Sequence, residues 1–251
     1  MKFTSRILTN QTVDLTDADF SEGEIILIDK PSGPTSFQII RKIRKITGVK
    51  KVGHSGTLDP LASGLMIVCT GKKTKEMDNF INLDKTYSGI IRLGFRSDSM
   101  DSESELSKVP LPENLNEQNI LETREKFSGE IEQTPPMYSA IKVKGKRLYN
   151  LARKGKSVER KPRRVLIKTF HIEKIDLPDI CFKISFSKGT YIRVIADEFG
   201  KALGTGGVLM NLRREKIGEF QVKNAFTIEQ FTNRINASAK LSGKNTTIYN
   251  N

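Results

Sequence analysis

The sequence has few of the residue types that build metal centres and disulfide frameworks. Its two cysteines, Cys69 and Cys181, lie in separate apolar runs typical of strands, and two isolated cysteines favour small core residues in a reducing compartment. Its two histidines, His54 and His171, have no cysteine or carboxylate nearby at ligand spacing, so we expect no metal site.

Long apolar runs are also absent. No segment approaches the ~18 consecutive apolar residues of a membrane span, and the first residues, "MKFTSRILTNQTVDL", lack the apolar core of a signal peptide. We therefore expect a cytoplasmic protein with no membrane segment.

Acidic residues are scarce in one segment in particular. The chain has 42 Lys and Arg against 29 Asp and Glu, a net charge of +13. Residues 142–164 hold 11 of the basic residues and one acid, Glu159, which leaves a net charge of only +3 elsewhere. Self-repulsion opposes such a concentration unless a polyanion offsets it, so the segment favours a nucleic-acid partner. A solvated lysine-rich hairpin is the alternative, and a membrane surface is disfavoured because few large apolar side chains are available to insert.

The apolar pattern switches irregularly between the periods of strands and helices. A helix over 36–48 has Ser36 as its expected cap and Gly48 at its end, and a second helix places Met77, Phe80 and Ile81 on one face. We expect further helices over 116–129 and 190–204, and strands over 24–29, 64–70 and 85–95, with an antiparallel pair within 165–188. We expect an exposed loop over 96–117, and a short helix with a polar tail at the end. This order predicts an α+β chain around a mixed, mainly antiparallel sheet.

Two glycine-containing stretches fail as nucleotide-binding motifs. "TGKKTK" has Met66 where a phosphate loop needs a glycine five residues before Gly71. "GTGG" at 204–207 lacks the third glycine of a dinucleotide fingerprint and follows a helix pattern rather than a strand. We therefore expect no nucleotide cofactor.

Asp59 stands out in "VGHSGTLDPLASGLMIVCTG", a stretch with almost no other charge. Aspartate is a preferred N-cap and proline a preferred first helical residue, so "LDPLAS" can be a helix start. The surrounding glycines and the polar side chains of His54 and Thr57 favour a site that a substrate approaches closely. From the local sequence alone, both interpretations stay open.

Six ordered segments give the chain a wider resemblance, which extends from about residue 24 to about residue 231. They are "LIDKPSGPTS", "GHSGTLDPLASGLMIVCTGKKTK", "DKTYSGIIRLGFRSDSMD", "GEIEQTPPMYSAIKVKGKRLYNLARKG", "FSKGTYIRVIADEFGKALG" and "LRREKIGEF". In this order they resemble the TruB family of synthases, which make pseudouridine in the T-loop of transfer RNA, at position 55. The resemblance implies the pseudouridine synthase fold, with a central mixed, mainly antiparallel sheet, flanking helices and a catalytic cleft.

The resemblance also implies roles for single residues. Asp59 matches the catalytic aspartate, Arg193 the arginine that pairs with it, and Tyr87 the aromatic that stacks on the target base. The substrate-contacting positions that the resemblance implies are His54, Lys30, Tyr191 and Leu212. Without it, Tyr87 and Tyr191 would be core aromatics, Arg193 a charge on a helix surface, and His54 a loop histidine.

The basic segment, from about residue 129 to residue 164, matches an insertion that folds onto RNA. We expect Lys154, Lys156, Arg160 and Lys161 to contact phosphates there. Residues 1–231 form the expected catalytic domain and 232–251 a short tail, too short for the further C-terminal RNA-binding module of many family members. We expect a monomer that acts on the T stem-loop of tRNA without metal or cofactor. An isomerase for ribosomal RNA and a basic RNA-binding protein without chemistry are the alternatives.

Overall fold

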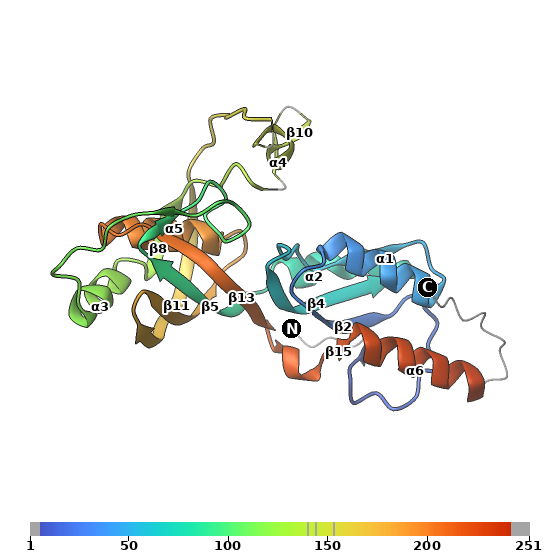
Figure 1. Cartoon of the computed structure of the whole chain (residues 1–251). Helices are drawn as coiled ribbons and strands as arrows, with labels where there is room; N and C mark the ends of the chain where they lie inside the picture. Colours follow the sequence, from blue (N-terminus) through green and yellow to red (C-terminus); the bar gives the residue numbers. More distant parts are fainter. Residues whose placement is uncertain (1–5, 140, 144, 153, 242–251) are drawn as a thin grey trace. The chain divides into compact units, whose positions relative to one another are not determined.

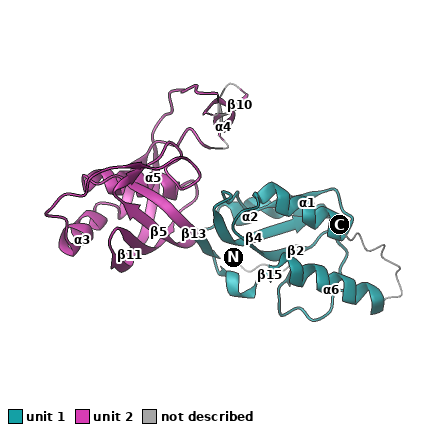
Figure 2. Cartoon of the chain, viewed as in Figure 1, with its two compact units in different colours: residues 1–85, 213–251 teal, residues 86–212 magenta. Residues whose placement is uncertain are grey.

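The computed structural model describes residues 6–139, 141–143, 145–152 and 154–241. The chain divides into two compact units (Figure 2). Unit 1 combines residues 1–85 with residues 213–251, and unit 2 is the continuous stretch 86–212 between them. Unit 1 is therefore assembled from two segments that are far apart in the sequence.

Unit 1 is built on a mixed sheet with the strand order β1-β2-β4-β13, in which only the last residues of β13 (Gly207–Ile217) belong to this unit. Figure 1 labels β2, β4 and β13. β1 (Ile7–Leu8) runs parallel to β2 (Ile25–Lys30), which pairs antiparallel with β4 (Ala62–Thr70). The short strands β3 (Val52–His54) and β14 (Phe220–Gln221) pair antiparallel with β4 and β13, and β15 (Phe226–Thr227) pairs parallel with β2.

Apolar side chains cover both faces of this sheet, which explains why β2 and β4 read as nearly continuous apolar runs. Ile25 and Leu27 point to a core shared with Leu65, Ile67 and Phe80. The helical elements of unit 1 are α1 (Ser36–Thr47), the 3-10 turns at Gly71–Glu76 and Val222–Asn224, α2 (Met77–Ile81) and α6 (Ile228–Leu241).

Helix α1 confirms the expected helix and corrects its cap. Thr35 is the N-cap, its hydroxyl accepting from the Gln38 backbone N–H, and Ser36 is the first helical residue. Gly48 ends the helix in the left-handed region, with φ 72°, as its position predicted. In α2 (Met77–Ile81), Met77 and Phe80 are buried, whereas Ile81, the last helical residue, is exposed.

Unit 2 is built on a sheet with the strand order β13-β5-β12-β11-β8. The expected antiparallel pair is confirmed as β11 (Arg163–Asp176) and β12 (Asp179–Phe186), and β8 (Gly129–Gln133) pairs antiparallel with β11. The helices α3 (Glu117–Glu125) and α5 (Ile192–Ala202) were both expected and belong to this unit. β5 (Lys85–Leu93) was expected, whereas β13 (Gly207–Ile217), which runs from unit 2 into unit 1, was not.

The loop expected over 96–117 is exposed only in part. It contains the end of β6 (Phe95–Arg96) and all of β7 (Ser107–Lys108), which pair with each other. Ser99 and Asp101 are buried, and Asp101 forms an isolated bridge to Leu209. The expectation of exposure from acidic and serine-rich composition is wrong at these residues, because their polar groups are bonded inside the unit.

Two further regions complete the described chain. Between β8 and β11 lie β9 (Lys142–Val143), β10 (Lys146–Arg147) and α4 (Leu148–Ala152), drawn in yellow-green in Figure 1. α6 extends to Leu241, so the expected domain boundary at residue 231 falls inside it, and the tail over 242–251 lies outside the described residues. The α+β class and the mixed, mainly antiparallel sheet are confirmed, and the cleft stays a prediction.

Candidate active site

Asp59 lies in a turn that leads into a strand. The Asp59 carbonyl accepts a hydrogen bond from the Ala62 N–H at 3.1 Å, and β4 begins at Ala62. The interpretation of "LDPLAS" as a helix start is therefore wrong. Asp59 itself is half-buried, so its carboxylate is at the boundary between the unit and solvent.

The N-terminal end of α1 and the turn before it hold the Asp59 loop in place. The buried Ser36 hydroxyl accepts from the Leu58 N–H at 2.8 Å and donates to the Leu58 carbonyl at 2.9 Å. The Gly33 N–H donates to the Pro60 carbonyl at 2.8 Å. The residues on both sides of Asp59 are thus bonded to one short segment, which fixes the direction of the backbone between them.

Lys30, the last residue of β2, also holds this loop in place. Its side chain is fully buried, and its ammonium group donates to the carbonyls of Pro31, Pro60 and Ala62. These bonds compensate a buried charge that would otherwise cost several kcal/mol. Lys30 therefore positions the loop through its hydrogen bonds. A contact between Lys30 and RNA stays a prediction.

Arg214 is a loop-holding residue that the sequence interpretation missed. It is only 1% exposed, and its guanidinium donates to the carbonyls of Leu65 and Gly56. Gly64 packs so tightly on the Arg214 backbone that an added Cβ would lie 2.4 Å from the Arg214 carbonyl oxygen. The burial of Arg214 results from tertiary packing, so the residues next to it in the sequence do not predict it.

His54 ends β3 on the approach to the same loop. Burial lowers the pKa of its imidazole; a hydrogen bond with the Gly56 backbone raises that pKa, and the nearby Arg214 charge lowers it further. The net effect keeps the ring neutral at physiological pH. A neutral imidazole offers one donor and one acceptor, which suits contacts to a nucleobase or a ribose.

Tyr87 lies in unit 2 on β5. It is 8% exposed, and its ring stacks on Phe186 with centroids 5.3 Å apart and an interplanar angle of 10°. Phe186 thereby holds one face of the tyrosine ring and sets its orientation. The expectation that Tyr87 stacks on a target base is not tested by this packing and stays a prediction.

Arg193 has a defined set of partners inside unit 2. The side chain is on α5 and 5% exposed, so the alternative of a charge on a helix surface is wrong. Its guanidinium donates to the carbonyls of Ser99 and Tyr138 and forms an ion pair with Asp101, with 3.4 Å between nitrogen and oxygen. The pairing of Arg193 with Asp59 stays a prediction.

Asp101 was missed by the sequence interpretation of the loop. It accepts from the Ser99 hydroxyl and from the Glu103 N–H at 3.0 Å, in addition to its ion pair with Arg193. The sequence did contain a hint that Asp101 is part of the fold, because "RSDSMD" ends one of the six segments that resemble the family. Its acidic composition nonetheless favoured a solvated loop.

Tyr191 and Leu212 are also in unit 2. Tyr191 is the N-cap residue of α5. The buried Gln133 side chain accepts from its backbone N–H and donates to its carbonyl. The Arg163 guanidinium lies over the Tyr191 ring at 5.0 Å from its centroid. Leu212 is buried on β13. The pocket-wall role of both residues stays a prediction.

The basic segment leaves most of its described charges in solvent. Lys154, Lys156 and Lys161 are exposed and Arg160 is half-buried. A short helix, α4, lies between Gly145 and Gly155, and its Leu148 is buried. Lys144 and Arg153, two of the segment's 11 basic residues, lie outside the described residues.

Comparison with known proteins identifies the family. Residues 44–192 match the TruB family pseudouridylate synthase (N terminal domain). The chain belongs to the TruB family. It is thus an enzyme of the isomerase class, and its fold agrees with the one that the resemblance implied.

Relatives in the TruB family cover nearly the whole chain. The tRNA pseudouridine synthase B of Chloroherpeton thalassium is 46% identical over 231 residues, which are 90% of this chain and 96% of the relative. That of Flavobacterium johnsoniae is 45% identical over 86% of this chain and 98% of the relative. A chain in the crystal structure of a Cbf5–Nop10–Gar1 complex is 26% identical with a TM-score of 0.69. That match covers 97% of this chain and 62% of the other, so the chain spans less than two thirds of that protein's length.

Two other kinds of feature are missing from the part of the chain that the structure describes. None of its helices is long and apolar enough to cross a membrane. No group of three or more His, Cys, Asp or Glu side chains is arranged to hold a metal ion within the described ranges.

Proposed function

We propose that the protein isomerises uridine to pseudouridine in tRNA, at position 55 of the T-loop, with Asp59 as the essential carboxylate. The observation that carries the proposal is the fixed turn of Asp59, held by Ser36 and Lys30 in a chain of the TruB family. The relatives named tRNA pseudouridine synthase B support tRNA as the substrate.

The proposed reaction transfers the sugar from one atom of the base to another. The bond between uracil N1 and ribose C1′ breaks, the base turns, and a bond forms between C5 and C1′. N1 gains a proton and C5 loses one, so atoms balance and no electrons are exchanged with another molecule. A carboxylate can serve by attacking C1′, by adding to the ring or by removing a sugar proton. In each case a fixed direction of approach accelerates the reaction.

A uridine inside a folded T-loop has to leave the base stack before Asp59 can reach it. Flipping costs a few kcal/mol, and stacking on an aromatic ring recovers roughly 1–3 kcal/mol. Tyr87 is proposed for this role, with Phe186 supporting the ring from behind. A neutral His54 is proposed to contact the displaced part of the loop.

The test of Asp59 is its replacement by asparagine, which keeps the shape and removes the charge. We expect Asp59→Asn to abolish pseudouridine formation, measured as tritium release from C5-labelled uridine in a tRNA transcript. Its affinity for the tRNA should stay within about tenfold of the unchanged protein, because the charge acts mainly on the chemical step. Asp78→Asn, which neutralises an exposed carboxylate of α2, is the matched control and should be fully active. Turnover by Asp59→Asn would refute the assignment.

The choice of RNA is tested separately. A T stem-loop hairpin should be modified in preference to ribosomal RNA fragments at equal concentration. Preferred modification of a ribosomal fragment would instead favour an isomerase for ribosomal RNA. Binding without turnover on any RNA would favour the non-catalytic RNA-binding alternative.

A further inference from the structure

Helix α1 of unit 1 carries a second group of basic residues, in addition to the basic segment of unit 2. Between Asp29 and Asp59 the chain has seven basic residues and no acidic one. One of them, Lys30, is buried and bonded to backbone carbonyls. Four of the other six are spread along α1, so whether they form one surface depends on the side of the helix that each occupies.

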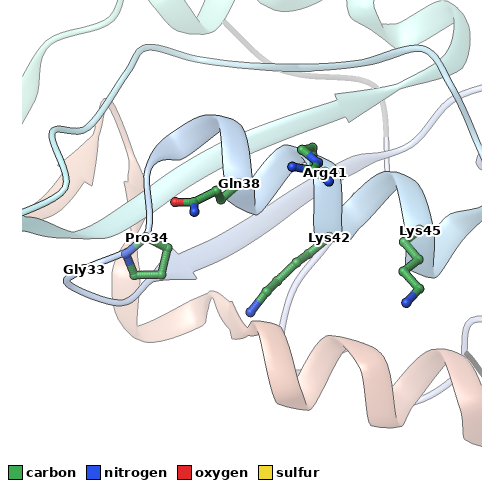
Figure 3. Close-up of a pocket in the computed structure, with 6 residues that line it drawn as sticks. All are labelled: Gly33, Pro34, Gln38, Arg41, Lys42 and Lys45. Atoms are coloured by element: carbon green, nitrogen blue, oxygen red, sulfur yellow. The ribbon is translucent and has the colours of Figure 1, made fainter. Parts of the chain in front are cut away.

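The helix brings its charges to one side. Ile39, Ile40 and Ile43 are buried, and the exposed side carries Phe37, Gln38, Arg41, Lys42 and Lys45. Figure 3 shows Gln38, Arg41, Lys42 and Lys45 around one hollow with Gly33 and Pro34 of the preceding turn. The hollow has a volume of about 610 Å³, and helix α6, which contacts α1, runs beside it.

Few negative charges are available to neutralise this face. Arg41 and Lys42 make no hydrogen bond or ion pair with any described residue. α6 carries one acidic residue, Glu229, in its first turn. Lys45 lies three residues after Lys42 and four after Arg41, so it is a neighbour of both on the helix surface, and these like charges repel one another. An anionic partner would offset that repulsion.

The face is physically joined to the Asp59 loop. Ser36 and Gly33, at the start of α1 and in its preceding turn, are bonded to Leu58 and Pro60. Arg41 follows Ser36 by five residues and Lys45 by nine, which places them roughly 7 and 13 Å further along the helix axis. An RNA strand that reaches Asp59 therefore passes close to this face within a few nucleotides.

Resting on the proposed function, we propose that the exposed face of α1 is a phosphate-binding surface for the RNA strand flanking the target uridine. Arg41, Lys42 and Lys45 contact successive phosphates. Phe37, an aromatic ring that is 62% exposed on the same face, stacks on a ribose or an unpaired base. The surface adds affinity and leaves the chemical step to the Asp59 loop.

The test is the triple variant Arg41→Ala, Lys42→Ala, Lys45→Ala, measured on the full chain with a T stem-loop hairpin by fluorescence anisotropy across a salt series. For every phosphate that the variant no longer binds, the log–log salt slope should fall by roughly 0.7 to 0.9, and affinity at about 0.1 M salt should fall on the order of 10- to 100-fold. The kcat at saturating RNA should be unchanged and KM raised, because these interactions are equal in ground and transition states. All three positions are exposed and alanine favours helix, so circular dichroism should show an intact fold.

The matched control removes three charges elsewhere in unit 1. Lys75, Lys216 and Lys223 are exposed and lie outside α1, and their joint replacement by alanine should change the salt slope far less. An equal fall in the control would overturn the proposal, because the effect would then be net charge alone. An unchanged slope in the α1 variant would overturn it outright, and unchanged affinity in Phe37→Ala would overturn its stacking part. Absence of pseudouridine formation by the unaltered protein would instead refute the proposed function, and the binding result would still decide this surface.

Discussion

Ser36 joins helix α1 to the loop that carries Asp59 through two hydrogen bonds from one hydroxyl. In Ser36→Ala the buried backbone groups of Leu58 lose their partner, so the free energy of unfolding should fall by about 1–3 kcal/mol. The kcat should fall as well, because the loop beside Asp59 is less well fixed. Urea unfolding and single-turnover kinetics measure the two effects.

Ser32→Ala is the control for that substitution. Ser32 is exposed and makes one bond to the same stretch of chain, from its hydroxyl to the Leu61 carbonyl at 3.0 Å. Removing this bond should lower the free energy of unfolding much less than Ser36→Ala does, because water can replace the Ser32 hydroxyl. Equal effects of the two serines would show that Ser36 does not position the loop.

Tyr87 combines packing and a proposed stacking role, and variants can separate them. Tyr87→Phe should keep most activity, because the ring still lies on Phe186, unless the hydroxyl takes part in proton transfer. Tyr87→Ala should lose far more, but it also opens a cavity that costs several kcal/mol. Tyr87→Leu fills much of that cavity without an aromatic face, so a stable Leu variant with low kcat would support stacking. Equal activity of the Phe and Leu variants would contradict it.

His54 should make stability depend on pH. Its pKa in the folded protein is lowered mainly by burial, whereas in the unfolded chain it is about 6.5. The unfolded state therefore binds the proton more readily, so stability is full above that value and falls as the pH drops below it. In His54→Gln, the free energy of unfolding measured with urea should differ less between pH 7.5 and pH 5.5 than it does in the unchanged protein. The exposed His171 provides the control, and an equal reduction of that difference by His171→Gln would argue against burial as the cause.

At the scale of elements, the basic segment around α4 is expected to bind RNA through its charges rather than its shape. Neutralising Lys154, Lys156, Arg160 and Lys161 together should weaken binding to all RNAs and lower the salt slope by roughly 0.7 to 0.9 for each phosphate no longer bound. The preference for a T-loop should change little, because phosphate contacts carry no sequence information. Filter binding to a T stem-loop and to an unrelated hairpin tests both statements, and an unchanged slope would identify the segment as a solvated face.

Elements with a strong local signal were predictable from the sequence, and those defined by distant partners were not. Helix α1 followed from the spacing of its isoleucines and from Gly48, and the pair β11–β12 followed from alternation. β13 was missed because its second half, "LRREKI", contains two adjacent arginines and a lysine and so has no alternating apolar pattern. The burial of Arg214 depends on the loop carbonyls to which it donates. The burial of Asp101 depends in the same way on Arg193, 92 positions further along.

For the candidate site, the sequence indicated Asp59 through the family resemblance, and local chemistry alone left a helix start equally open. The turn at Ala62 decided against the helix. The loop-holding roles of Ser36, Lys30 and Arg214 emerged only from the structure, because their bonds to the Asp59 loop join residues that are 22 or more positions apart.

At the scale of the molecule, positive charge is divided between the units. The basic segment belongs to unit 2, and the α1 face belongs to unit 1. The two proposed RNA-binding surfaces share no residue, so each can be neutralised by substitution without changing a residue of the other. A chain with two such surfaces gains speed of association with a polyanion from both.

The split of unit 1 into two sequence segments has a consequence for synthesis on the ribosome. β4, an apolar strand, has β2 along one edge. On its other edge the short strand β3 pairs with Val68–Thr70, and the remaining open part of that edge waits for the last residues of β13. The residues of unit 2 separate β4 and β13 in the sequence, so at roughly 5–20 residues per second β4 waits on the order of 10 s for its neighbour. During that time its open edge is a site for pairing with other nascent chains. Slowed translation between residues 86 and 212 should therefore lower the soluble yield more than an equal delay after residue 217.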